Sequence, residues 1–147
     1  MVQSLVPVGP EDLYHTLEVL SPNPKPLPWA MEALRASLDE PLEALLLAEK
    51  VGLCQQVGLE LALTPEGQAW LNTPWEPPAA LLLFLLQTLP WPEALERLKS
   101  QGNTLPLMAL LSLFPNGPKG EKAARALAEW GALLGFWELL EDRIEGR

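Results

Sequence analysis

Few residues of this sequence have the types and spacing that catalysis or metal binding requires. The single histidine, His15, lies four residues after Glu11 and three before Glu18, and the chain has only three aspartates. Acid–base catalysis needs a positioned base, and a metal site needs several ligands. A lone histidine among carboxylates is typical of a surface pair. We therefore assign no catalytic or metal-ligating residue and expect a non-enzymatic protein without a cofactor.

The sequence also gives little support for a reactive cysteine or a phosphate-binding loop. One cysteine, Cys54, excludes an internal disulfide and a cysteine metal cluster. A reactive thiol needs a nearby cation, and only Lys50 is close in sequence, so we expect a structural thiol. The segment 117–120, Gly-Pro-Lys-Gly, has the wrong spacing for a G-x-x-x-x-G-K-[ST] phosphate loop, and its proline removes a backbone donor.

The distribution of charge limits the choice of partner. The 147 residues carry a formal net charge of -9, and residues 1–77, with 11 acids and 3 bases, hold -8 of it. Phosphate contacts dominate nucleic-acid affinity and require Lys or Arg, so any nucleic-acid contact belongs to residues 78–147. The candidate cations there are Lys119, Lys122 and Arg125, extended by Arg97 and Lys99 if their helices meet. The alternative is an ordinary solvated face, with Glu93 spaced to pair with Arg97.

Six tryptophans are candidates for a partner surface, because tryptophan dominates interface energetics. Trp70 and Trp130 fall on apolar helix stripes, so we expect both in the core. Trp75 and Trp91 each follow a proline and are the candidate exposed contacts with a partner protein.

The composition predicts a mostly α-helical chain, since 34 Leu and 16 Ala stand against 6 Val and one Ile. The longest apolar run, residues 79–86, is too short to span a bilayer and predicts a buried helix. No targeting segment is visible, and we expect a cytoplasmic protein without membrane insertion. Sixteen prolines, few Asn and one Cys are typical of a thermophile.

The spacing of apolar residues and the positions of Pro and Gly predict the elements of a winged helix in residues 1–77. Helices are expected from Pro10 and Pro28, and a third follows Asp39, its predicted N-cap, with a broad apolar side formed by Leu42, Leu45, Leu46 and Leu47. Alternation around Gly58 predicts a hairpin over 53–57 and 59–63, and Thr64-Pro65 begins a return helix.

Residues 78–147 are predicted to repeat this plan with a truncated wing. Helices are expected over 79–89, 92–101 and 105–114, followed by a long last helix ending near 131–135 and a short apolar piece over 136–140. We therefore expect a tandem winged-helix-like architecture of two subdomains, 1–77 and 78–147. The last four residues, 144–147, spell a protease cleavage sequence, and we assign them no function.

The segment 57–70, which contains Leu-Thr-Pro-Glu-Gly, and the Trp130-Gly131 step carry a family resemblance. They resemble the AAA-associated domain at the C-terminus of nitrate/sulfonate-type ABC transporter ATPase subunits. The resemblance covers residues 11–142 and implies a tandem winged-helix fold with an ATPase as a candidate partner. The chain departs from the family after Trp-Gly, where Ala132-Leu133 replaces Arg-Tyr.

Charge on the predicted recognition helix decides between the functions of such a fold. Residues 38–52 carry four acids against Lys50 alone, and this surface should repel a duplex. We expect a module that binds another protein. The alternatives are a DNA-binding regulator that uses the second half and a minimal hydrolase around His15. Self-association through exposed leucines or the wing edge stays open.

Overall fold

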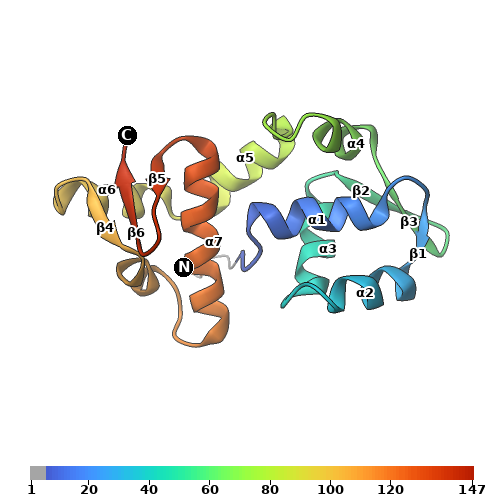
Figure 1. Ribbon diagram of the computed structural model, residues 1–147, viewed down its shortest axis with the longest axis horizontal. Helices are drawn as coiled ribbons and strands as arrows, with labels where there is room; N and C mark the ends of the chain where they lie inside the picture. The colour runs from blue at the N-terminus through green and yellow to red at the C-terminus, as the bar shows by residue number, and fades with distance from the viewer. Residues whose placement is uncertain (1–5) are drawn as a thin grey trace. The chain divides into compact units, whose positions relative to one another are not determined.

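The computed structural model describes residues 6–147 and is mostly helical, with two three-stranded antiparallel sheets (Figure 1). This confirms the prediction of a mostly α chain with a short hairpin. The described chain divides into two compact units, one of Glu11–Gln87 and one of residues 6–10 with Thr88–Arg147. The helix expected over 79–89 is thus grouped mainly with the first part of the chain, ten residues beyond the predicted boundary at 77.

The unit Glu11–Gln87 follows the expected order, with the added strand β1 and the apolar helix α5. Its elements are α1 (Pro10–Leu20), β1 (Lys25–Pro26), α2 (Leu27–Arg35), α3 (Pro41–Lys50), β2 (Cys54–Val57), β3 (Glu60–Leu63), α4 (Pro65–Asn72) and α5 (Ala79–Thr88). Leu13, Leu17 and Leu20 are buried on one face of α1, as their spacing predicts. Thr64 caps α4, because its hydroxyl accepts a hydrogen bond from the Gly67 amide at 3.2 Å.

The sheet of this unit has the order β1-β3-β2, so the second hairpin strand lies in the middle. Gly58 makes the hairpin turn with a φ of +65°, which a glycine adopts without steric cost. Leu61 in β3 is buried opposite Lys25 and Gln56. The two-residue β1 was not predicted, since it forms only by pairing with β3.

The second unit has a similar order of elements. It contains α6 (Trp91–Ser100), β4 (Thr104–Pro106), the 3-10 helix η1 (Leu107–Leu113), α7 (Pro118–Leu134), β5 (Trp137–Leu139) and β6 (Arg143–Gly146). The sheet order is β4-β6-β5. The helix predicted over 105–114 is wrong in its first part, because Leu105 and Pro106 pair with β6 and only the rest coils, as a 3-10 helix.

Matching details show that the two units repeat one topology of helix, strand, helix, helix and hairpin. The amide of Leu27 donates to Leu59 O in one unit, and the amide of Leu107 donates to Asp142 O in the other. Gly52 and Gly135 end the helix before each hairpin with φ of +78° and +85°. The last residues belong to this repeat, since Ile144 is fully buried in the central strand β6.

Two expectations about individual helices are wrong. Glu40, not Asp39, is the N-cap residue of α3, and no side chain caps this helix. The apolar helix α5 is only partly covered, because Leu81 and Leu85 are buried while Leu83 and Leu86 are exposed. None of the helices within residues 6–147 combines the length and the apolarity that crossing a bilayer requires.

The Trp130-Gly131 step is a close contact in the core of the second unit. The indole N–H of Trp130 donates to Val8 O and that of Trp137 to Ala128 O, both at 2.8 Å, and both rings are buried. A Cβ on Gly131 would lie 2.1 Å from the Trp137 ring. Only glycine lets the helix backbone approach the indole this closely.

Gly131→Ala should therefore destabilise the chain, although alanine is the better helix former. We expect the free energy of unfolding to fall by about 1–3 kcal/mol from overpacking, measured by urea denaturation. Ala132→Gly is the control and should cost only about 1 kcal/mol of helix propensity. An unchanged or raised stability of Gly131→Ala would show that the ring does not constrain this position.

Candidate interaction surface

The helix α3 holds the candidate surface because it turns apolar side chains to both the core and the solvent. Pro41 begins the helix, and Ala44, Leu45, Leu47 and Ala48 are buried. Leu42 and Leu46 were expected on one broad apolar side with Leu45 and Leu47, and they are 55% and 51% exposed. One turn apart, they form a continuous outward ridge, which Glu49 extends by another turn. We call Leu42, Leu46 and Glu49 the α3 stripe.

The charges around this stripe are mostly negative. Asp39 before the helix and Glu49 near its end are both exposed. The only cation within residues 38–52 is Lys50, whose Nζ lies 5.3 Å from the centre of the Phe84 ring, a cation–π contact. Burial raises the pKa of Asp12, and the charges of Asp39 and Glu11 raise it further against a smaller opposing effect of His15. Carboxylates therefore crowd the start of α1 and the approach to α3.

Further apolar side chains are exposed elsewhere in the same unit. Trp75 is 74% exposed, as predicted, between the prolines of the connection after α4. Leu59 at the hairpin turn is 85% exposed. The other large exposed apolar residues of the unit are Leu27, Trp29, Val57, Leu83 and Leu86.

Trp91 does not lie on a partner surface, and its expected exposure is wrong. Only 4% of the side chain is exposed, and its ring packs edge-on against Phe136 with centroids 4.9 Å apart. The ring centroid of Trp137 lies 5.8 Å from that of Trp91. Phe136 directly precedes β5 and Trp137 is its first residue, more than forty residues further along the chain, so the prolines beside Trp91 gave no sign of them.

The predicted cations of the second unit are not one continuous patch. Arg97 does not extend such a patch as supposed, because its guanidinium is half-buried and donates to Ala109 O at 2.9 Å and to the Ser112 hydroxyl. The helix α6 packs mainly on β4, β6 and η1, whereas α7 packs mainly on η1 and β5. In α7, Lys119 and Arg125 are exposed and Lys122 is half-buried, and Arg125 lies 3.8 Å from the Glu129 carboxylate.

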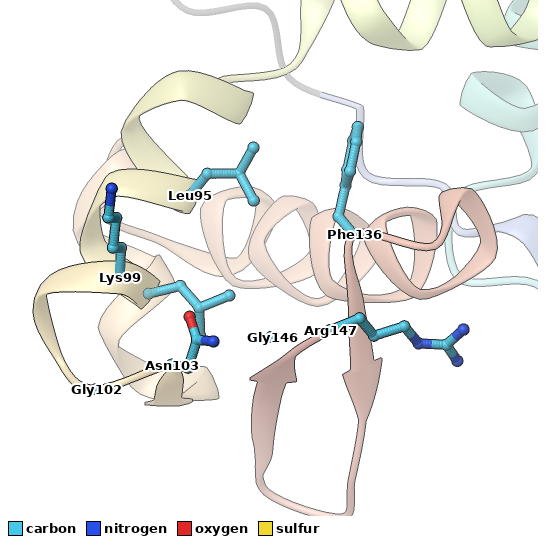
Figure 2. Close-up of a pocket in the computed structure, with 8 residues that line it drawn as sticks. Leu95, Lys99, Gly102, Asn103, Phe136, Gly146 and Arg147 are labelled. Carbon is cyan, nitrogen blue, oxygen red and sulfur yellow. The ribbon is translucent and has the colours of Figure 1, made fainter.

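The last predicted cation, Lys99, borders a hollow in the second unit. The hollow measures about 540 Å³, and Leu95, Leu98 and Phe136 give it an apolar lining. Figure 2 shows that the charged ends of Lys99 and Arg147 extend away from each other, so the two cations do not converge on one ligand group. The two charged ends therefore do not form a joint site for an anionic group in this hollow.

His15 and Cys54 both belong to the unit Glu11–Gln87. His15 Nε2 lies 3.0 Å from the Ser37 hydroxyl, and Nδ1 lies 3.5 Å from the Glu18 carboxylate. No group of three or more His, Cys, Asp or Glu side chains in the described part of the chain is arranged to hold a metal ion. Cys54 is buried, and burial together with Glu49 raises the pKa of its thiol from 9.0 to about 11.

Alkylation of Cys54 should consequently be slow in the native protein. A pKa higher by about two units lowers the thiolate fraction at pH 8 about 100-fold. Iodoacetamide labelling should be slower by at least this factor than in urea-unfolded chain, and comparable rates would refute the buried position. Because the native state holds the proton more tightly, this group should also lower stability as pH rises from 9 towards 11.

The chain was compared with protein families, curated proteins and solved structures. No family model, curated protein or solved structure matches the chain. The resemblance to the AAA-associated domain therefore stays a prediction.

Proposed function

We propose that this chain is a non-enzymatic module of tandem winged-helix type that binds another protein through the unit Glu11–Gln87. Its twofold order of helix, strand, helix, helix and hairpin, with the last strand in the middle of each sheet, supports this assignment. In such a module, α3 and α7 each precede a wing and stand at the place of the recognition helix.

The observation that carries the proposal is the composition of the outward side of α3. Two half-exposed leucines lie where a DNA-binding helix needs groups for bases and phosphates. The only cation within residues 38–52, Lys50, lies over the Phe84 ring. Exposed apolar side chains rimmed by polar groups are typical of a protein interface.

The family resemblance makes an ATPase subunit the first candidate partner, because the similar domains are joined covalently to one. Exposed Trp75 is a candidate second contact, since tryptophan supplies much binding energy per residue. It belongs to the same unit as α3.

We expect the purified chain to form a stoichiometric complex with a protein from its source cells and to leave a labelled DNA duplex unbound at physiological salt. Affinity capture followed by size-exclusion chromatography with light scattering measures the first result, and fluorescence anisotropy measures the second. Tight duplex binding with steep salt dependence, in the absence of any protein complex, would refute the proposal.

A DNA-binding regulator is the second candidate, and one observation favours it. The helix α7 has the same place in its unit as α3 and carries Lys119, Lys122 and Arg125. Against it, Arg125 lies beside Glu129, and Thr88–Arg147 carries 8 acids against 7 bases.

If DNA is bound through α7, reversing its three cations together to Glu should abolish binding. Removing about three phosphate contacts should also reduce the slope of log K against log[salt] by about three. The matched triple reversal of Glu121, Glu138 and Glu141 to Lys should not weaken binding. Unchanged duplex affinity in the first variant would dismiss this candidate.

A further inference from the structure

We propose that the segment of the partner that docks on the α3 stripe is a basic amphipathic helix. This inference rests on the proposed function and names the chemistry of the partner at the same site. Three properties of α3 carry it: the spacing of its exposed leucines, its paired backbone and the charge around it.

The spacing of the exposed leucines selects a helical partner. Leu42 and Leu46 are one turn apart and form a short apolar ridge of the i, i+4 type. Such a ridge packs into the groove between side chains of a second helix. Apolar anchors at i, i+3, i+4 and i+7 of the partner would cover both leucines.

The backbone of α3 argues against an extended segment at this place. Inside the helix the amide and carbonyl groups are paired with each other, as the amide of Ala44 is with Glu40 O at the first turn. A strand adds to a sheet edge through free backbone groups, and the middle of a helix offers none. The side chains alone therefore provide the contacts.

The charge around the stripe requires a basic partner. Glu49 continues the stripe, and Asp39 is exposed before the helix. The unit Glu11–Gln87 carries 11 acids against 3 bases. This potential attracts a cationic segment and repels a second copy of the same unit.

A designed peptide tests the chemistry directly. The probe is an 18-residue Leu/Lys peptide with leucines at i, i+3, i+4 and i+7, compared with a scrambled peptide of the same composition and a Leu/Glu peptide of the same pattern. Isothermal titration calorimetry on the full chain should show binding of the patterned Leu/Lys peptide, weaker binding of the scrambled one and no binding of the Leu/Glu one.

A pair of matched variants assigns that binding to α3. The double variant Leu42→Gln with Leu46→Gln should bind the patterned peptide about tenfold or more weakly, because it loses two interface anchors. Leu83→Gln with Leu86→Gln, on α5, removes two leucines of the same unit with matched exposure, 56% and 50%, and should leave the affinity unchanged. Circular dichroism and thermal melting show whether both variants keep the fold.

In these experiments the inference is overturned by equal binding of the scrambled peptide, equal losses in both double variants, failure of the patterned Leu/Lys peptide to bind, or a dimer of the chain that the α3 variant dissociates. A natural protein complex that survives Leu42→Gln with Leu46→Gln at full affinity overturns this inference and leaves the function standing. Duplex binding without any protein complex overturns the function itself.

Discussion

A helix of ten residues can turn only part of its circumference toward a core, and α3 carries more apolar side chains than that part can bury. Ala44, Leu45, Leu47 and Ala48 fill the inner side. Leu42 and Leu46 are left at the surface, where each exposed methylene group costs about 0.8 kcal/mol relative to burial. The surface of α3 is thus set by the limited capacity of the core, and a partner can recover the burial that folding does not provide.

The two units use one topology in different ways. In the first unit, the helix before the hairpin is short, exposes two leucines and has carboxylates near both of its ends. In the second, that helix has 17 residues and carries cations on its exposed part, with a core held by the hydrogen-bonded indoles of Trp130 and Trp137. A shared chain path therefore does not imply a shared partner, because the side chains that face outward differ in kind.

Much of the fold could be predicted from local signals. The apolar period of α1, the Thr64 cap and the turn at Gly58 each depend on a few neighbouring residues, and each prediction is confirmed. The strand β1 could not be predicted, because two residues in a proline-rich segment have no period and acquire their form from β3. The burial of Trp91 likewise depends on Phe136 and Trp137, which are distant in sequence.

The sequence predicts the sign of the charge around α3, but it does not predict which apolar side chains of this helix face outward. Counting acids in residues 38–52 gives the sign of the field around α3. The sequence also shows that the four leucines between 42 and 47 form a broad apolar side, and this breadth is a signal that some must face outward. Which of them do so is decided by where α2 and β2 pack against α3, and only the structure contains that information.

The most direct test of the central claim is photo-crosslinking at the α3 stripe inside source cells. A photoreactive amino acid is placed at position 46 and, as a matched site on α5, at position 83. We predict one protein crosslinked from position 46, far less product from position 83, and no crosslink to DNA from either. Crosslinking of position 46 to DNA, or equal protein crosslinking from both positions, would contradict the assignment of α3 as the docking surface.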